Sequence, residues 1–157
     1  MHTELVGRFG DAILALEGGA EPAIRVRPNA LVAVAGALKT DPALAFDCLS
    51  SQSGVDYPKR QAIEIVLHLF SYEHRHALVV KVAVPRDAPE VATLANVWRA
   101  AIWQEREIFD LLGVVFTGHP DLRRLLLPED WVGHPLRKDY VEPVEYHGIS
   151  TKRESLL

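Results

Sequence analysis

The sequence predicts an α+β protein: a two-layer sandwich in which helices cover a mixed, mostly antiparallel sheet, followed by an extended C-terminal strap. Three observations support this fold class. Two neighbouring segments at 61–84 alternate apolar and polar residues, helical periodicity occurs before and after them, and the segment that follows is rich in proline and glycine. We divide the chain into an α+β domain (1–116), an extended segment expected to make interactions (117–147) and a weakly tied-down tail (148–157).

The composition fits one globular domain and excludes several kinds of function. The chain has 157 residues, 48% of them hydrophobic, which is enough for a single core. Its net charge of −4 provides no basic field for nucleic acid. The single Cys48 excludes an intramolecular disulfide and any cluster or zinc site built from this chain's thiolates alone. With neither a secretion signal nor an apolar run of the ~20 residues that span a bilayer, we expect a soluble protein of a reducing compartment.

The first third of the chain predicts helices and one short strand. Apolar residues recur at helical spacing over 3–17, which indicates an amphipathic helix. Residues 23–27 alternate and predict a strand. Pro28 opens a second helix through about Leu38, and Pro42 allows a turn near Leu44. A strand near 47–56 is also expected.

The strongest strand pattern lies in the middle of the chain. Two runs each place their branched residues on one face: Ile63, Ile65, Leu67 and Leu69, then Leu78, Val80, Val82 and Val84. Residues 71–76 join them as an exposed hairpin loop. Pro85 ends the second strand, and a helical region is expected from Val91 onward.

The helix that ends at Gly113 carries a carboxylate in the middle of its apolar face. On a wheel of about 100° per residue, Glu105 falls within the stripe formed by Trp98, Ile102, Phe109 and Leu112. A carboxylate in this position needs a cation, hydrogen-bond donors or a proton. Gly113 then fits a left-handed C-cap.

The cation for Glu105 is expected to come from the segment beyond the helix. Arg106 points about 100° away from Glu105, so we expect Arg123, Arg124 or Arg137 to supply the guanidinium, and a proton-handling role for Glu105 is the alternative. Arg106 and Asp110 are four residues apart and are expected to pair on the helix surface.

The extended segment is neither helix nor strand by pattern, yet it is too apolar for a solvated loop. Three prolines and two glycines interrupt residues 117–140, which also contain several leucines and Trp131. Long structureless stretches in compact domains tend to be functional. This one should therefore lie against a surface, either its own or a partner's. Trp98, Trp103 and Trp131 are expected to be core or interface anchors.

Three linked motifs carry a resemblance to a known family. They are Glu105-Arg-Glu-x-Phe-Asp-Leu-Leu-Gly113, Gly118-His-Pro-Asp-Leu-Arg-Arg124 and Gly133-His-Pro-Leu-Arg-Lys-Asp-Tyr140. Together they resemble the signature of the 30-kDa subunit (the C subunit) of NADH–quinone oxidoreductase, respiratory complex I. Val55-Asp-Tyr-Pro58 also looks like the family, and the resemblance covers roughly residues 28–147.

The resemblance implies a non-catalytic scaffold in the hydrophilic arm of a proton-pumping complex, on the cytoplasmic side of the membrane. The chain would bind no flavin and no iron–sulfur cluster itself, and would dock against cluster-bearing and quinone-site subunits of the 49-kDa, 20-kDa and 23-kDa types. The residues expected to serve structure or interface are Glu105, Arg106, Asp110, Gly113, His119, Pro120, Arg123, Arg124, Trp131, Gly133, Pro135, Arg137, Lys138 and Asp139. The equivalent subunit of a membrane-bound hydrogenase, or of a plastid-type complex that takes electrons from ferredoxin, is an alternative.

An independent histidine-metal enzyme is the alternative from another class. His68, His74 and His76 flank the hairpin loop, and a pair such as His74 and His76 could sit on one side of a strand. A solvated polar loop is the simpler interpretation. His119 and His134 lack a third close ligand and are predicted to be structural. No nucleophile elbow or phosphate-binding loop is present.

Overall fold

The computed structural model describes residues 7, 9–18 and 22–151. Its main body is a five-stranded sheet in the order β1-β2-β5-β4-β3. The strands are β1 (Ile13–Glu17), β2 (Ala23–Val26), β3 (Cys48–Tyr57), β4 (Ala62–Ser71) and β5 (His76–Pro85). Within this sheet, β2 and β5 pair in parallel, and the other neighbouring strands pair in antiparallel fashion. The α+β class with a mixed, mostly antiparallel sheet is therefore confirmed.

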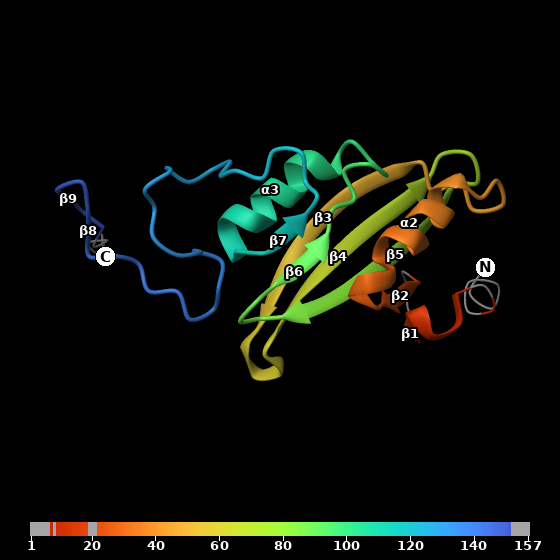
Figure 1. Cartoon of the computed structure of the whole chain (residues 1–157), viewed down its shortest axis with the longest axis horizontal. Coiled ribbons are helices and arrows are strands. Elements are labelled where there is room, and N and C mark those ends of the chain that lie inside the picture. The colour runs from red at the N-terminus through yellow and green to blue at the C-terminus, as the bar shows by residue number, and fades with distance from the viewer. Residues whose placement is uncertain (1–6, 8, 19–21, 152–157) are drawn as a thin grey trace, which may run out of the picture.

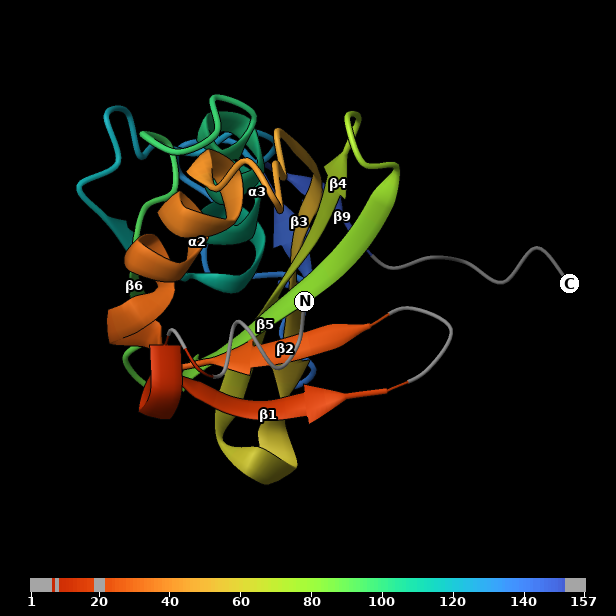
Figure 2. The same ribbon diagram turned by 90° about the vertical axis from the view of Figure 1, so that its right-hand side faces the viewer.

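One face of this sheet is covered by two helices and a short second sheet (Figures 1 and 2). The helices are α2 (Leu31–Thr40) and α3 (Ala101–Leu112), and β6 (Glu90–Ala92) pairs in parallel with β7 (Val115–Thr117). Short 3₁₀ turns occur at Gly10–Ala12, Pro28–Ala30 and Pro58–Arg60. The predicted helix from Pro28 is thus a 3₁₀ turn that continues as α2.

The alternating residues of the central strands form the core, as predicted. The six predicted positions Ile63, Ile65, Leu67, Leu78, Val80 and Val82 are all buried. The register places Val80 between Ile24 of β2 and Leu67 of β4. Burial of branched side chains on one face stabilises the sheet by roughly 1.5–3 kcal/mol per side chain, so this layer fixes the register.

Two predicted helical regions are wrong in part: residues 7 and 9 are helical, but 13–17 and the residues from Val91 to Ala100 are not. Residues 13–17 form β1 instead of the end of a helix, because their backbone pairs with β2 and the sheet overrides the local apolar pattern; residues 3–6 and 8 lie outside the described part. Val91 lies in β6, where it pairs with Phe116 of β7. Turns follow β6, and α3 begins only at Ala101.

The chain beyond β7 extends past the end of the sheet (Figure 1). Between Gly118 and Val144 it contains no helix or strand, and a small hairpin of β8 (Glu145–Tyr146) and β9 (Ile149–Ser150) follows. The predicted weakly tied tail therefore begins within this hairpin, and its residues 152–157 lie outside the described part. The boundaries at 116 and 147 stay predictions.

Candidate interaction site

Helix α3 lies between the sheet and the extended segment. The side chains on its buried face toward the sheet include Ala101, Glu105, Ile108 and Leu112. The predicted stripe is only partly right, since Ile102 and Phe109 are half-buried. Gly113 ends the helix at φ +78°, and its N–H donates to the Phe109 carbonyl at 2.9 Å. A Cβ at Gly113 would lie 2.5 Å from Nε2 of His134. Glycine is therefore favoured here both by the positive φ and by the close approach of the His134 ring.

Glu105 is fully buried, as its wheel position predicts, and is held by uncharged donors. The Thr93 hydroxyl donates to Oε2 at 2.5 Å, and the Leu94 N–H donates to Oε1 at 2.7 Å. The His119 Nε2 lies 4.0 Å from Oε2, and the buried amide of Gln52 faces the same carboxyl group without a well-formed hydrogen bond. Burial raises the pKa of Glu105, and these neighbours oppose the rise only in part.

The prediction that an arginine pairs with Glu105 is wrong. Arg123 is largely exposed and pairs with Asp121 at 3.0 Å. Arg124 pairs with Asp110, and Arg137 donates its Nε–H to the Leu112 carbonyl at 2.8 Å. Thr93 takes the place of the cation because the turn after β6 brings its hydroxyl over α3.

Asp110 is the residue at which α3 binds the extended segment. Its Oδ1 accepts a hydrogen bond from Nη1 of Arg124 at 2.8 Å. Its Oδ2 accepts three backbone N–H groups, from Leu125, Leu126 and Leu127, at 3.1, 2.8 and 2.9 Å. Burial tends to raise the pKa of Asp110, but these four donors outweigh it and leave the pKa below its ordinary value.

Arg106 also binds the backbone of the extended segment. It donates to the carbonyl oxygens of Arg123 and Arg124 at 3.1 and 3.0 Å. Its Nη1 approaches Asp121 at 3.8 Å. The expected surface pair between Arg106 and Asp110 is therefore wrong: both side chains are buried, and each holds the backbone of the segment instead.

His119 and His134 fix the two ends of this contact on backbone groups. Nδ1 of His119 accepts the Asp121 N–H at 3.0 Å. The hydrogen of the neutral His119 ring is therefore on Nε2, which donates to the Ile102 carbonyl at 3.0 Å. Nδ1 of His134 donates to the Asp110 carbonyl at 3.0 Å. Both rings therefore act as structural groups.

A second anchor joins the extended segment to the sheet. Arg86 donates to both oxygens of Asp56 at 2.7 and 3.0 Å, and it also binds Asp139. Asp56 accepts the Lys138 N–H at 2.8 Å as well. Arg86 is the main cause that lowers the pKa of Asp56. Neither Arg86 nor Asp56 was among the predicted site residues, because their contacts join distant parts of the sequence.

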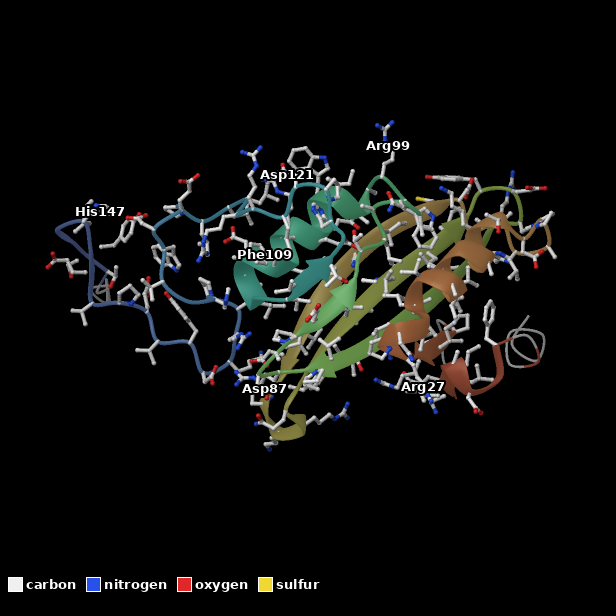
Figure 3. All side chains as sticks on the ribbon, in the orientation of Figure 1. Arg27, Asp87, Arg99, Phe109, Asp121 and His147 are labelled. Atoms are coloured by element: carbon white, nitrogen blue, oxygen red, sulfur yellow. The ribbon has the colours of Figure 1, made fainter. Side chains whose placement is uncertain are left out.

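The remaining predicted site residues shape the segment. Gly133 has φ +84°, and a Cβ there would lie 2.9 Å from the Tyr140 ring. The Trp131 carbonyl accepts from Nη2 of Arg124 at 2.8 Å, and its indole lies 5.1 Å from the Tyr146 ring. Pro120 and Pro135 lack an N–H and follow His119 and His134 directly. Tyr146 and His147 both bind Asp130, far from the sheet (Figure 3).

The apolar side chains of the segment are either half-buried or exposed. Five of them are between 54% and 84% exposed: Leu126, Val132, Leu136, Val141 and Val144. The domain thus binds the segment largely through its backbone and leaves these five apolar side chains in contact with solvent. Isolated exposed apolar residues are common, but such a row along one held segment is typical of a contact surface.

The described part of the chain contains neither a cluster of side chains arranged to bind a metal ion nor a helix able to span a membrane. In residues 7, 9–18 and 22–151, no group of three or more His, Cys, Asp or Glu side chains is arranged to hold a metal ion. His74 and His76 bind the carbonyl oxygens of Pro42 and Leu44, at 2.8 Å each, so the hairpin loop is tied to the turn after α2. None of the helices in those residues has the length and apolar character needed to cross a bilayer.

The fold and this junction define a class: α+β proteins whose last helix holds the backbone of a long irregular segment. A solved chain of an archaeal membrane-bound sulfane sulfur reductase, a respiratory membrane complex, shares the fold with a TM-score of 0.75 at 23% identity, over 89% of this chain and 83% of that one. A trypsin-resistant fragment (residues 1–134) of Nqo5 matches with a TM-score of 0.65 at 27% identity, over 78% of this chain and all of the fragment.

Residues 24–146 match the family described as the 30-kDa subunit of respiratory-chain NADH dehydrogenase, and the chain belongs to this family. The C subunit of NADH-quinone oxidoreductase from Chlorobium phaeobacteroides is 42% identical, over 90% of this chain and 87% of its own length. The same subunit from Roseiflexus castenholzii is 49% identical, over 74% and 67%. The C subunit of F(420)H(2) dehydrogenase from Methanosarcina mazei is 44% identical, over 87% of each chain.

Proposed function

We propose that this chain is a non-catalytic scaffold subunit in the hydrophilic arm of a membrane-bound, proton-pumping NADH–quinone oxidoreductase. The extended segment docks it against the other subunits of that arm. One observation carries the proposal: buried groups of α3 and β3 bind the backbone of the segment, while five of its apolar side chains stay exposed. A segment ordered in advance loses less conformational entropy when a partner covers it.

The partners in this proposal are the 49-kDa, 20-kDa and 23-kDa types of subunit. Flavin and iron–sulfur clusters reside in partner subunits, and the chain reaches the cytoplasmic face of the membrane only through the complex. Membership of the 30-kDa subunit family supports this placement. The relative named for F(420)H(2) makes a different electron donor the second candidate, and the same docking role applies there.

Co-purification tests the proposal. The tagged full chain is recovered from solubilised membranes, and cluster-bearing subunits are identified in the product by mass spectrometry and visible absorbance. Leu126→Asp, on the exposed row, should lower their recovery about tenfold or more, since it places a charge in the interface. Tyr72→Asp is the matched control, because Tyr72 is similarly exposed but lies in the hairpin loop between β4 and β5.

Two results would contradict the proposal. One is a tagged chain that recovers none of the cluster-bearing subunits. The other is a Leu126→Asp chain that assembles as well as the Tyr72→Asp chain. An unchanged thermal midpoint for both variants excludes unfolding as the cause of a loss.

A further inference from the structure

β3 is an edge strand of the five-stranded sheet. The strand order places β1 and β3 at the two edges of the sheet (Figures 1 and 2). Within the described residues, no backbone hydrogen bond joins the outer edge of β3 to another element. An edge of this kind presents a row of N–H and C=O groups that can accept another strand.

The two edges differ in how they are protected against strand addition. β1 has five residues, an irregular register between Ile13 and Ala15, and Glu17 in ion pairs with Arg25 and Lys81. β3 has ten residues; its register with β4 shifts between Leu49 and Ser51 and is regular from Ser51 to Tyr57. It carries no charge and no proline from Cys48 to Val55. Natural edge strands that stay unpaired are usually short, bulged or charged, so the regular, uncharged stretch of β3 from Ser51 to Val55 has the features of an edge that becomes paired.

A groove beside this edge would receive side chains of an added strand. It lies between β3 and α3 and is lined by Gln52, Ser53, Gly54, Ile108, Leu111 and Leu136, among others. Gly54 lets the helix come close, since a Cβ there would lie 2.3 Å from Cδ1 of Leu112. Alternate residues of an added strand would point to the helix side of the sheet, where Ile108, Leu111 and Leu136 offer apolar contacts.

We propose that an extended segment of a partner subunit adds to the sheet at β3 and places apolar residues in this groove. The inference rests on the proposed function and extends it. Leu136 belongs to the extended segment, so the groove is continuous with the proposed docking surface. Beyond Tyr57, a pocket is bordered by the cations Lys59, Arg60 and Lys138. The partner segment therefore carries an acidic residue at the end that lies over Tyr57.

Amide hydrogen exchange tests strand addition directly. Exchange is measured on the full chain alone and within the purified complex. On assembly, the outward-facing amides within 51–57 should slow by about 100-fold or more, because they gain ladder hydrogen bonds. The amides of β1 serve as the control and should keep their rates.

The outcomes separate this inference from the proposed function. If amides of the extended segment slow on assembly while those of β3 do not, the docking role stands and strand addition is wrong. If the chain recovers no partner subunits, both are wrong. If the β3 amides of the free chain slow with rising protein concentration, β3 pairs with a second copy, and the partner-segment proposal is overturned.

A charge reversal tests the chemistry of the partner segment. Lys59→Glu should slow association with the partner subunits about tenfold at low salt, since it opposes the predicted acidic residue. Arg27→Glu is the matched control, because it makes the same change of charge at an exposed position beside α2. Equal association rates for the two variants would contradict the proposal that the partner segment carries an acidic residue at this end.

Discussion

The five-stranded sheet and the extended segment are stabilised by different groups of the chain. The sheet buries branched side chains such as Ile65 and Val82 on one face. The extended segment buries few of its own side chains, and Asp110, Arg106 and Asp56 bind its backbone. This difference shows that a segment without helix or strand can still be ordered, provided that the domain supplies the donors and acceptors.

The largest expected effect is in the sheet. Val80→Asp should unfold the isolated chain, with a cost above about 4 kcal/mol, because it buries an unpaired charge between β2 and β4. Urea unfolding monitored by circular dichroism measures the change. Ala77→Asp, on the exposed opposite face of the same strand, is the control. An unchanged midpoint for Val80→Asp would show that the register of β5 is wrong by one residue.

The next effect is local to the extended segment. Asp110→Asn should weaken the segment's attachment by about 3 kcal/mol, because Arg124 loses its anion and the backbone N–H groups lose a charged acceptor. Hydrogen exchange of Leu125 to Leu127 should then be about 100-fold faster, while the sheet amides change little. Glu107→Gln, an exposed carboxylate on the same helix, is the control. Loss of the whole fold would mean that the segment belongs to the core.

The attachment of the extended segment to Asp110 should also depend on pH. Because the folded pKa of Asp110 lies below its ordinary value of 3.8, the stabilisation is complete above that value and is lost as the pH falls through the lower folded pKa. Exchange at Leu126 followed across this pH range measures the loss. A segment that opens near neutral pH would contradict the assignment.

A smaller effect is expected at Glu105. Because burial raises its folded pKa, the wild-type chain should lose stability as the pH rises above 4.5 towards the folded pKa. Glu105→Gln should remove this loss and change stability at neutral pH by only about 1 kcal/mol, since the amide can still bind Thr93 and Leu94. Urea unfolding at several pH values tests both. A Glu105→Gln complex that assembles normally but fails in turnover would favour proton handling over a structural role.

The smallest effect on the isolated chain is expected at Arg123. Its side chain is 73% exposed, so Arg123→Ala should change the free energy of unfolding by less than about 0.5 kcal/mol. The same change should weaken recovery of partner subunits, because exposed arginines are frequent interface anchors. Normal assembly would place the contact elsewhere along the segment.

The sequence predicted those parts of the structure that depend on local periodicity. The alternation in β4 and β5 identified the core, and the wheel position of Glu105 predicted its burial. The helix predicted over 3–17 is wrong over 13–17, where Ile13 and Leu16 fit the helical period but the backbone pairs with β2. Thr93 was missed as the partner of Glu105 because nothing local indicates that the turn after β6 crosses α3. Asp110 was among the predicted residues, but its backbone partners depend on the path of a segment that has no period.

The parallel pairing of β2 with β5 has a consequence for the order in which the chain folds. β3 and β4 lie between these strands in the sequence, so β2 and β5 meet only after a long loop has closed. The hairpins from β3 to β5 close through short turns and can form early. During synthesis, β1 and β2 emerge before β5, and β2 can pair with β5 only once that strand has been made. We therefore expect the hairpin of β1 and β2 to join the sheet after β3, β4 and β5 have paired.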